Sequence, residues 1–297
     1  DSAPAFGPEL QFLEKRAVHG TVSRAIFFAA NDDDNGGFAR RGGENIQGSA
    51  DPMTTACGML FPAFHSMRIV MTKSFETLGE FRASVRSQFS VQFGEVESAS
   101  EIAIAELSAI SGNAPPYYIV GVLFWLRSIE SCQGTVLLAE RGLATSPFSV
   151  LRTALECLFA ACAVWRKPEV ADKIEAWHHV ERVKQAKQVL SVGPEGRVTP
   201  EGLAALKAIA AETVPPSGWS HWEAATAADL QFEYAMMYRG LGIGGAHASA
   251  RSLDDFHAAQ SDGSFDLHVR PTSDRLAWLL GLVANCLKLG ISRHRGA

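Results

Sequence analysis

The chain has 297 residues, and its 27 Lys and Arg against 32 Asp and Glu give a formal net charge of −5 at pH 7. Nonspecific affinity for nucleic acid depends on a basic excess, so this charge argues against a general nucleic-acid coat. A content of 47% hydrophobic and 20% charged residues is typical of a globular chain and excludes a disordered or fibrous protein.

The cysteines are odd in number, and four of the five fall within apolar, helix-like runs. Such positions are typical of reduced core residues, so we expect a cytoplasmic protein. The longest apolar runs, 117–126 and 276–291, are shorter or more interrupted than the roughly 18 apolar residues that a membrane span needs. We therefore expect no membrane association. The cysteines are Cys57, Cys132, Cys157, Cys162 and Cys286.

The first seventy residues differ in composition from the rest of the chain. Residues 31–37, 40–43 and 48–52 are rich in Gly, Asp and Arg, without a sustained apolar period. This composition predicts a weakly ordered N-terminal extension over residues 1–70. The alternative interpretation is that the native start lies at Met71 and that the preceding residues carry no function.

Residues 71–297 are predicted to form one all-α domain, a helical bundle of about seven helices. Apolar residues recur at helical spacing through most of this region, and Pro115-Pro116 and Thr199-Pro200 are helix start signals. The short run 265–269 is the only candidate strand. The predicted helices span 75–110, with a weak point at Phe93-Gly94, and 116–140, 146–166, 168–192, 199–213, 222–241 and 273–293.

The predicted helix 146–166 is apolar on all sides except at Arg152 and Glu156. These residues are four apart, so their side chains share one face. Charged groups inside a core are costly unless they pair. In the preceding helix, Arg127 and Glu130 form a similar polar stripe, and the two helices could face a common seam. The alternative is a salt-bridge network that only fixes helix register.

A second group of polar residues follows the predicted helix 222–241. Gly240, Gly242 and Gly245 match the dinucleotide pattern GxGxxG, but no strand precedes them, so we expect no cofactor there. Arg239 and His247 flank this glycine-rich break. Arginine can neutralise a phosphate and histidine can move a proton near pH 7, so both are candidate catalytic residues. A capping or packing role for His247 is the alternative.

Residues from about 115 to 290 resemble a bacterial family described as domain of unknown function (DUF) family 5677. Arg152 and Glu156 match its Arg-x-x-x-Glu helix, and Tyr238, Arg239 and His247 match its second motif. Gly242 stands where the family pattern has serine, and the spacing from Arg239 to His247 is one residue longer. This family is similar in turn to the helical HEPN superfamily.

The HEPN resemblance implies a dimer whose two copies form one site, as in metal-independent ribonucleases of toxin and antiphage systems. Those enzymes carry Arg-x(4 to 6)-His, whereas seven residues separate Arg239 from His247 here. The expected fold is therefore a HEPN-like helical bundle, and the expected partners are a second copy of the chain and RNA or a small anionic ligand.

Two weaker patterns remain. Glu175, His178, His179 and Glu181 have the spacing of metal ligands, and Asp254 and His257 could add a second pair, but a solvated helix face explains them as well, and we expect no metal and no cofactor. Trp219 and Trp222 flank His221 and could line a groove or anchor helices against each other.

These patterns lead to one main functional hypothesis and two alternatives. In a ribonuclease, His247 would transfer the proton, Arg239 or Arg152 would neutralise phosphate charge, and Glu156 would orient an arginine. The alternatives are a non-catalytic interaction or anion-sensing module with a structural Arg/Glu network, and a metal-dependent bundle oxidoreductase.

Overall fold

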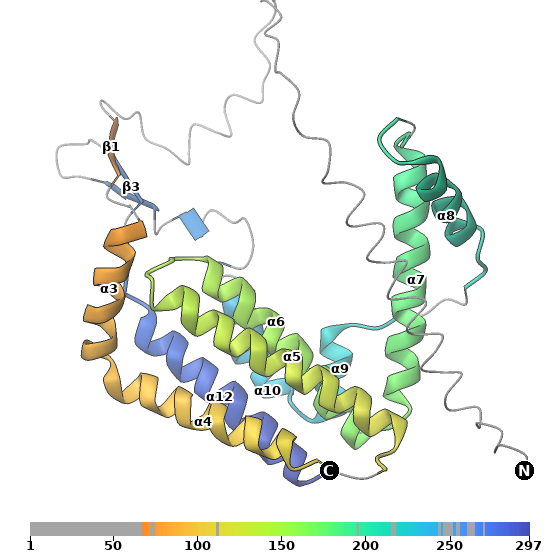
Figure 1. The fold of residues 1–297 in the computed structure, drawn as a ribbon, viewed down its shortest axis with the longest axis horizontal. Helices are drawn as coiled ribbons and strands as arrows, with labels where there is room; N and C mark the ends of the chain where they lie inside the picture. Colours follow the sequence, from red (N-terminus) through yellow and green to blue (C-terminus); the bar gives the residue numbers. More distant parts are fainter. Residues whose placement is uncertain are drawn as a thin grey trace, which may run out of the picture. The chain divides into compact units, whose positions relative to one another are not determined.

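The protein is described by a computed structural model that covers residues 67–71, 75–110, 113–194, 196–214, 218–242, 245, 252–253, 256–259, 265–269 and 271–297. These residues fall into two compact units, one within 67–174 and 218–297 and the other within 175–217. The described residues are mostly helical in both units, which confirms the predicted all-α class (Figure 1).

The larger unit is a bundle in which α5 and α6 lie along each other and α12 packs against both (Figure 1). Helix α4 packs on α12, and α9 packs on α6. Its helical elements are α3 (Phe75–Gln88), α4 (Ser90–Ser108), α5 (Pro116–Ala139), α6 (Ser146–Arg166), α9 (His221–Ala228), α10 (Gln231–Glu233), the π-helical turn η1 (Tyr234–Tyr238), α11 (Arg239–Leu241) and α12 (Leu276–Arg295).

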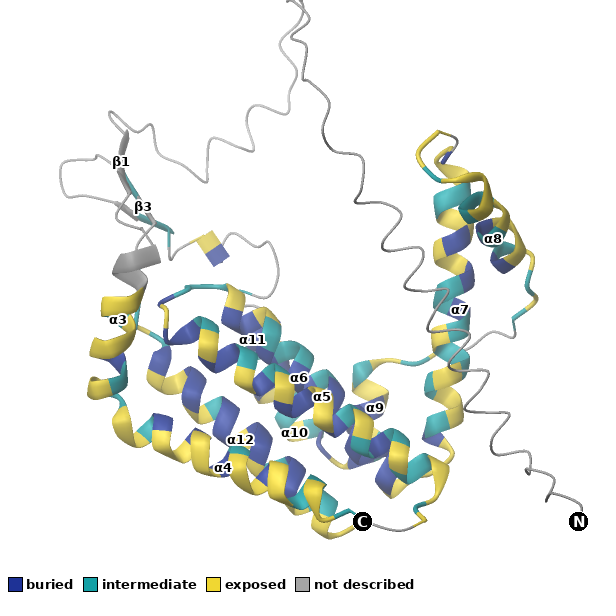
Figure 2. Cartoon of the chain, viewed as in Figure 1, coloured by how far each residue is buried: buried dark blue, intermediate teal, exposed yellow. Residues whose placement is uncertain are grey.

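Helix α6 is the centre of the bundle, and most of its side chains are buried (Figure 2). Its alanines allow close approach of α5, whose Ser128 hydroxyl donates a 2.8 Å hydrogen bond to the carbonyl of Ala154. By length and composition, α6 and α12 are each apolar enough to cross a membrane, but 72% of the apolar window of α6 and 50% of that of α12 are buried inside the protein. Burial on all sides accounts for the apolar composition of α6.

Two predicted helices are interrupted in the structure. The predicted helix 75–110 breaks at Phe89, earlier than the expected weak point. The predicted helix 222–241 breaks at Asp229, whose φ of 59° is left-handed and ends α9. Aspartate tolerates this conformation, and contacts from two arginines hold it: Arg166 lies 3.1 Å from its carboxylate and Arg293 donates to its carbonyl.

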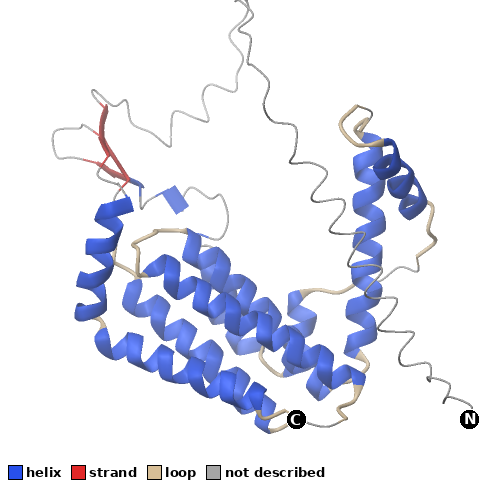
Figure 3. Ribbon diagram, viewed as in Figure 1, coloured by secondary structure: helices blue, strands red, loops and turns tan. Residues whose placement is uncertain are grey.

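A three-stranded sheet joins distant parts of the chain (Figure 3). The predicted strand 265–269 is β3 (Phe265–Val269), but it was wrong to expect it to be the only strand. It pairs in parallel with β1 (Met67–Met71), with Met67 opposite Phe265, and antiparallel with β2 (His257–Ala259). Strand β1 falls largely within the predicted N-terminal extension, of which residues 1–66 lie outside the described residues.

The smaller unit is a helical hairpin of α7 (Val170–Ser191), which begins in the larger unit, and α8 (Pro200–Ala210). Val183 and Ala186 on α7 pack against Leu206 and Ile209 on α8 in a small core of their own. The predicted helix start is confirmed, because the Thr199 hydroxyl accepts the amide of Gly202 at 3.2 Å.

Helix α3 is held to the end of α5 by a carboxylate that the sequence analysis did not single out. The Glu140 side chain has no exposed surface, yet its two oxygens lie 2.6 Å from Arg82 Nε and 2.7 Å from Arg86 Nε on α3. A buried ionised group that loses its partners is strongly destabilising, so the pairing matters more than the burial itself. The pairing therefore fixes α3 against the bundle.

Two tryptophans on α5 and α6 pack edge to face, with ring centroids 5.7 Å apart. The indole nitrogen of Trp125 is placed against Gly290 on α12, and that of Trp165 against Gly121 on α5. A side chain at either glycine would overlap the indole ring. Glycine is required at both positions because the aromatic ring occupies the space of a Cβ atom.

Candidate functional site

The structure brings Arg152 and Glu156 together on the one polar part of α6. Arg152 Nε lies 3.4 Å from Glu156 Oε1, and the side chains are 20% and 26% exposed. The neighbouring α6 positions Leu151, Leu155 and Leu158 are fully buried. The pair therefore lies at the boundary between the core and solvent, where both groups remain reachable by a ligand.

Tyr238 completes a hydrogen-bonded triangle with this pair. Its hydroxyl donates to Glu156 Oε1 at 2.9 Å and accepts from Arg152 Nη2 at 2.5 Å. The guanidinium of Arg152 also lies over the Tyr238 ring, 4.1 Å from the centroid. Burial and the bond to Glu156 raise the pKa of Tyr238 to about 12, so the phenol keeps its proton at neutral pH.

The π-helical turn η1 places Tyr238 at this position. Tyr234 and Tyr238, at its two ends, stack with ring centroids 4.8 Å apart, and the buried Phe159 of α6 lies against both rings. A π-helical turn is wider than an α-helical one and is frequent at functional sites. The turn thus fixes the phenol in front of Glu156.

His221 brings an imidazole to the same carboxylate. It is the first residue of α9, whose start is capped by the Ser220 hydroxyl accepting the amide of Glu223 at 3.2 Å. His221 Nε2 lies 3.5 Å from Glu156 Oε1, and its ring centroid lies 5.7 Å from that of Tyr238. Because the imidazole is 39% exposed, it can exchange protons with solvent or with a ligand.

The four side chains form a compact polar site that we call the Glu156 cluster: Arg152, Glu156, His221 and Tyr238. The positive charge of Arg152 is balanced by the carboxylate of Glu156. A carboxylate beside an exposed imidazole is an arrangement that supports proton transfer. Within the described part of the chain, no three His, Cys, Asp or Glu side chains are grouped so that they could hold a metal ion.

Of the other two candidate catalytic residues, Arg239 and His247, the structure describes only Arg239. Arg239 directly follows Tyr238 in α11 and is exposed. His247 lies outside the described residues, as does Asp254. The nearby His257 has its Nδ1 2.8 Å from the carbonyl of Leu253.

The seam proposed between Arg127, Glu130 and the α6 pair is not formed, and both α5 residues are exposed. The reason is the helical period, since α5 meets α6 through the face that carries Trp125, Ser128 and Cys132, which leaves positions 127 and 130 on the outer side.

Two of the candidate metal ligands of α7, His179 and Glu181, contact other charged side chains. The imidazole of His179 contacts the carboxylate of Glu212, and Arg182 donates to both oxygens of Glu212 at 3.0 and 2.8 Å. The hydrogen bond from His179 and the charge of Arg182 lower the pKa of Glu212. His178 and Glu175 are exposed, as a solvated helix face predicts.

His221 was not predicted from the sequence to lie beside Glu156. The local sequence shows only that it lies between two tryptophans, and nothing in it links position 221 to Glu156. Tyr238 was noted as part of the family motif but without a role. Its proximity to Glu156 depends on the π-helical turn, which has no signal in the apolar periodicity.

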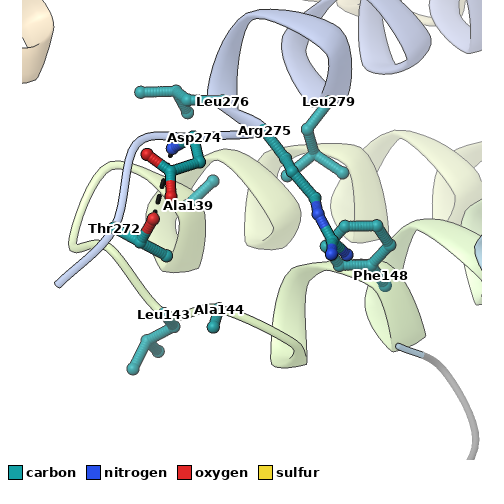
Figure 4. A pocket seen from close by; sticks show the side chains of 9 residues that line it. All are labelled: Ala139, Leu143, Ala144, Phe148, Thr272, Asp274, Arg275, Leu276 and Leu279. Carbon is teal, nitrogen blue, oxygen red and sulfur yellow. Dashed lines mark hydrogen bonds between the residues drawn. The ribbon is translucent and has the colours of Figure 1, made fainter. Parts of the chain in front are cut away.

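A separate hollow lies where α5 ends and α6 and α12 begin (Figure 4). Its empty volume is about 330 Å³, open solvent included, and its walls are mostly apolar, with Arg275 extended over the Phe148 ring at 5.6 Å from the centroid. The amide of Asp274 donates to the Thr272 hydroxyl at its rim. None of the Glu156 cluster lines it.

Comparison with known proteins gives one match. Residues 118–265 match the family model described as "Family of unknown function (DUF5677)", and this range includes every member of the Glu156 cluster. No curated protein and no solved structure matches the chain.

Proposed function

Since the chain belongs, through residues 118–265, to the family of unknown function DUF5677, we propose its activity from the site itself: a metal-independent ribonuclease in which His221 transfers the proton. The observation that carries the proposal is the exposed His221 imidazole 3.5 Å from the Glu156 carboxylate, with Arg152 beside them. The HEPN-like character and the toxin or antiphage setting rest on the resemblance of the two motifs.

The proposed reaction is attack of a ribose 2′-hydroxyl on the adjacent phosphate. His221 accepts the 2′-hydroxyl proton as the new P–O bond forms, the bond to the 5′-oxygen breaks, and that oxygen takes a proton from solvent water; the protonated imidazole then returns its proton to solvent. The products are a 2′,3′-cyclic phosphate and a 5′-hydroxyl end. Glu156 orients the imidazole, and general acid–base catalysis of this kind contributes about 10²- to 10⁴-fold in rate.

The two arginines near the site, Arg152 and Arg239, have different roles in this proposal. The guanidinium of Arg152 is bonded to Glu156 and Tyr238, so it orients the carboxylate. The exposed Arg239 is free of the core and supplies charge to the phosphate. This replaces the earlier hypothesis that His247 moves the proton.

The expected setting follows from the resemblance. We propose a homodimer, with RNA as substrate, in the cytoplasm. A net charge of −5 restricts RNA binding to the neighbourhood of the site, since the chain as a whole repels a polyanion.

The experiment compares RNA cleavage in the presence of a chelator by the wild type, His221→Gln, His247→Ala and the control His178→Gln, which alters an exposed histidine of the smaller unit. Wild type and His178→Gln cleave equally, and His221→Gln loses about 100-fold or more in rate at an unchanged melting temperature. Full activity of His221→Gln with loss in His247→Ala would overturn the assignment of His221.

A non-catalytic interaction or anion-sensing module is the second candidate. One observation favours it: the guanidinium of Arg152 is already engaged by Glu156 and Tyr238, and this triangle links α6 to η1. In that case Glu156→Gln lowers the melting temperature while RNA stays intact at high concentrations of wild-type protein.

A further inference from the structure

A tryptophan next to the Glu156 cluster is exposed to solvent. Trp222 follows His221 in α9 and is 47% exposed. Tryptophan is normally well buried, because its large apolar ring gains free energy when it leaves water. By contrast, Trp219 on the other side of His221 packs against the core of the bundle and has the anchoring role.

Aromatic contacts connect Trp222 to the site. The Trp222 ring meets Tyr234 edge to face, with centroids 5.2 Å apart and an interplanar angle of 68°. Tyr234 stacks on Tyr238, whose hydroxyl donates to Glu156. Trp222 is thus held in place by the same aromatic rings that position the polar site.

The exposed face of Trp222 is itself a planar apolar surface. A planar apolar surface next to a proton-transfer group suits a ligand that has a flat ring at one end and a polar group at the other. A nucleotide has this form, because its base stacks on aromatic rings while its phosphate needs polar contacts.

We propose that Trp222 stacks an unpaired base of single-stranded RNA beside the nucleotide whose phosphate reacts at His221. The inference rests on the proposed function and names its substrate class. The bases of duplex RNA are already stacked on one another, so a duplex cannot offer a free ring to Trp222. Stacking on the indole ring does not distinguish one base from another, so we expect the site to bind single-stranded RNA without sequence preference.

The test uses a fluorescent single-stranded oligonucleotide with 2′-O-methyl groups, which cannot be cleaved by attack of a 2′-hydroxyl. Its Kd is measured by anisotropy for the wild type, Trp222→Ala, Trp222→Phe and Trp278→Ala. Trp278 lies on α12 and is also 47% exposed, so it is the matched control. Melting temperatures establish that each variant folds.

Trp222→Ala is expected to weaken binding about tenfold, within the range that alanine substitution of a stacking residue produces. Trp222→Phe retains most of the affinity because it keeps a ring, and Trp278→Ala binds like the wild type. A duplex of the same sequence binds more weakly than the single strand. Equal affinity of Trp222→Ala and wild type, or tighter binding of the duplex, would overturn the inference.

The two proposals fail in different ways. If Trp222→Ala weakens binding but the wild type does not cleave unmodified RNA, the ribonuclease function is wrong and the stacking surface stands. If wild type cleaves RNA and Trp222→Ala binds and cleaves equally well, the stacking proposal is wrong and the function stands. No binding of the oligonucleotide by the wild type contradicts the stacking proposal directly.

Discussion

The hydroxyl of Tyr238 lies 2.9 Å from Oε1 of Glu156 and donates its proton to that carboxylate. The two residues are 82 positions apart in the chain, and their bond joins the central helix α6 to the turn η1. The orientation of the Glu156 carboxylate toward His221 therefore depends on Tyr238, a buried residue.

Replacement of Tyr238 by phenylalanine removes this bond and keeps the aromatic stack. Because Glu156 loses a donor and Arg152 loses an acceptor, the free energy of unfolding falls by about 1–2 kcal/mol. Urea unfolding of the variant and the wild type measures the change. Tyr117→Phe, which alters a tyrosine outside the Glu156 cluster, is the control and leaves stability within about 0.5 kcal/mol.

Alkaline pH weakens the same contact. The folded pKa of Tyr238 is raised to about 12 by burial and by the bond to Glu156, above the value of about 10 for an unfolded tyrosine. The stability from the neutral phenol is therefore complete below pH 10 and is lost as pH rises towards 12. The stability difference between wild type and Tyr238→Phe is expected to shrink over that interval in urea titrations; a constant difference would be inconsistent with the raised pKa.

The fold was predictable where its signals are local. The start of α5 at Pro116 and the cap of α8 at Thr199 depend on residues within one helical turn. The break at Asp229 comes from a left-handed residue that ends α9, which apolar periodicity does not mark, so the predicted helix runs across it. Strand β2 has only three residues, too few to show an alternating pattern, and β1 lies largely in the region whose composition predicted a weakly ordered extension; both are identified only by their pairing with β3.

In the candidate site, too, the contacts between residues close in sequence were predictable, whereas the contacts between distant residues were not. Arg152 and Glu156 are neighbours because residues four apart share a helix face, and this contact follows from the sequence. The positions of His221 and Tyr238 depend on how α9 and η1 pack against α6, which no spacing rule describes. The fully buried Glu140 was not singled out either, because its arginine partners belong to another helix.

Removal of the buried carboxylate in Glu140→Ala is expected to destabilise the protein by about 2–4 kcal/mol, because it removes the contacts of Glu140 with Arg82 and Arg86 and leaves a cavity, although Arg86 keeps its pair with Glu97. The control Glu95→Ala breaks a pair with Lys288 in which both side chains are about half exposed, and it costs at most about 1 kcal/mol. Thermal denaturation ranks the two variants; equal losses would contradict the anchoring role of Glu140.

Replacement by alanine is expected to have opposite effects on stability at two glycines of α12, Gly290 and Gly281. A Cβ atom at Gly290 would overlap the indole nitrogen of Trp125, whereas Gly281 has nothing within 4 Å of that position. Gly290→Ala is therefore expected to destabilise by about 1–3 kcal/mol, and Gly281→Ala to stabilise by up to about 1 kcal/mol because alanine favours the helix. Melting curves of both variants check the signs, and a stable Gly290→Ala would show that Trp125 can move.

The most direct measurement of the central claim is the chemical identity of the ends that wild-type protein leaves on RNA in the presence of a chelator, determined by mass spectrometry. Proton transfer by His221 from a 2′-hydroxyl predicts 2′,3′-cyclic phosphate and 5′-hydroxyl ends, with their yield lost in His221→Gln. Ends with a 3′-hydroxyl and a 5′-phosphate, or RNA that remains intact at high protein concentration, would contradict it.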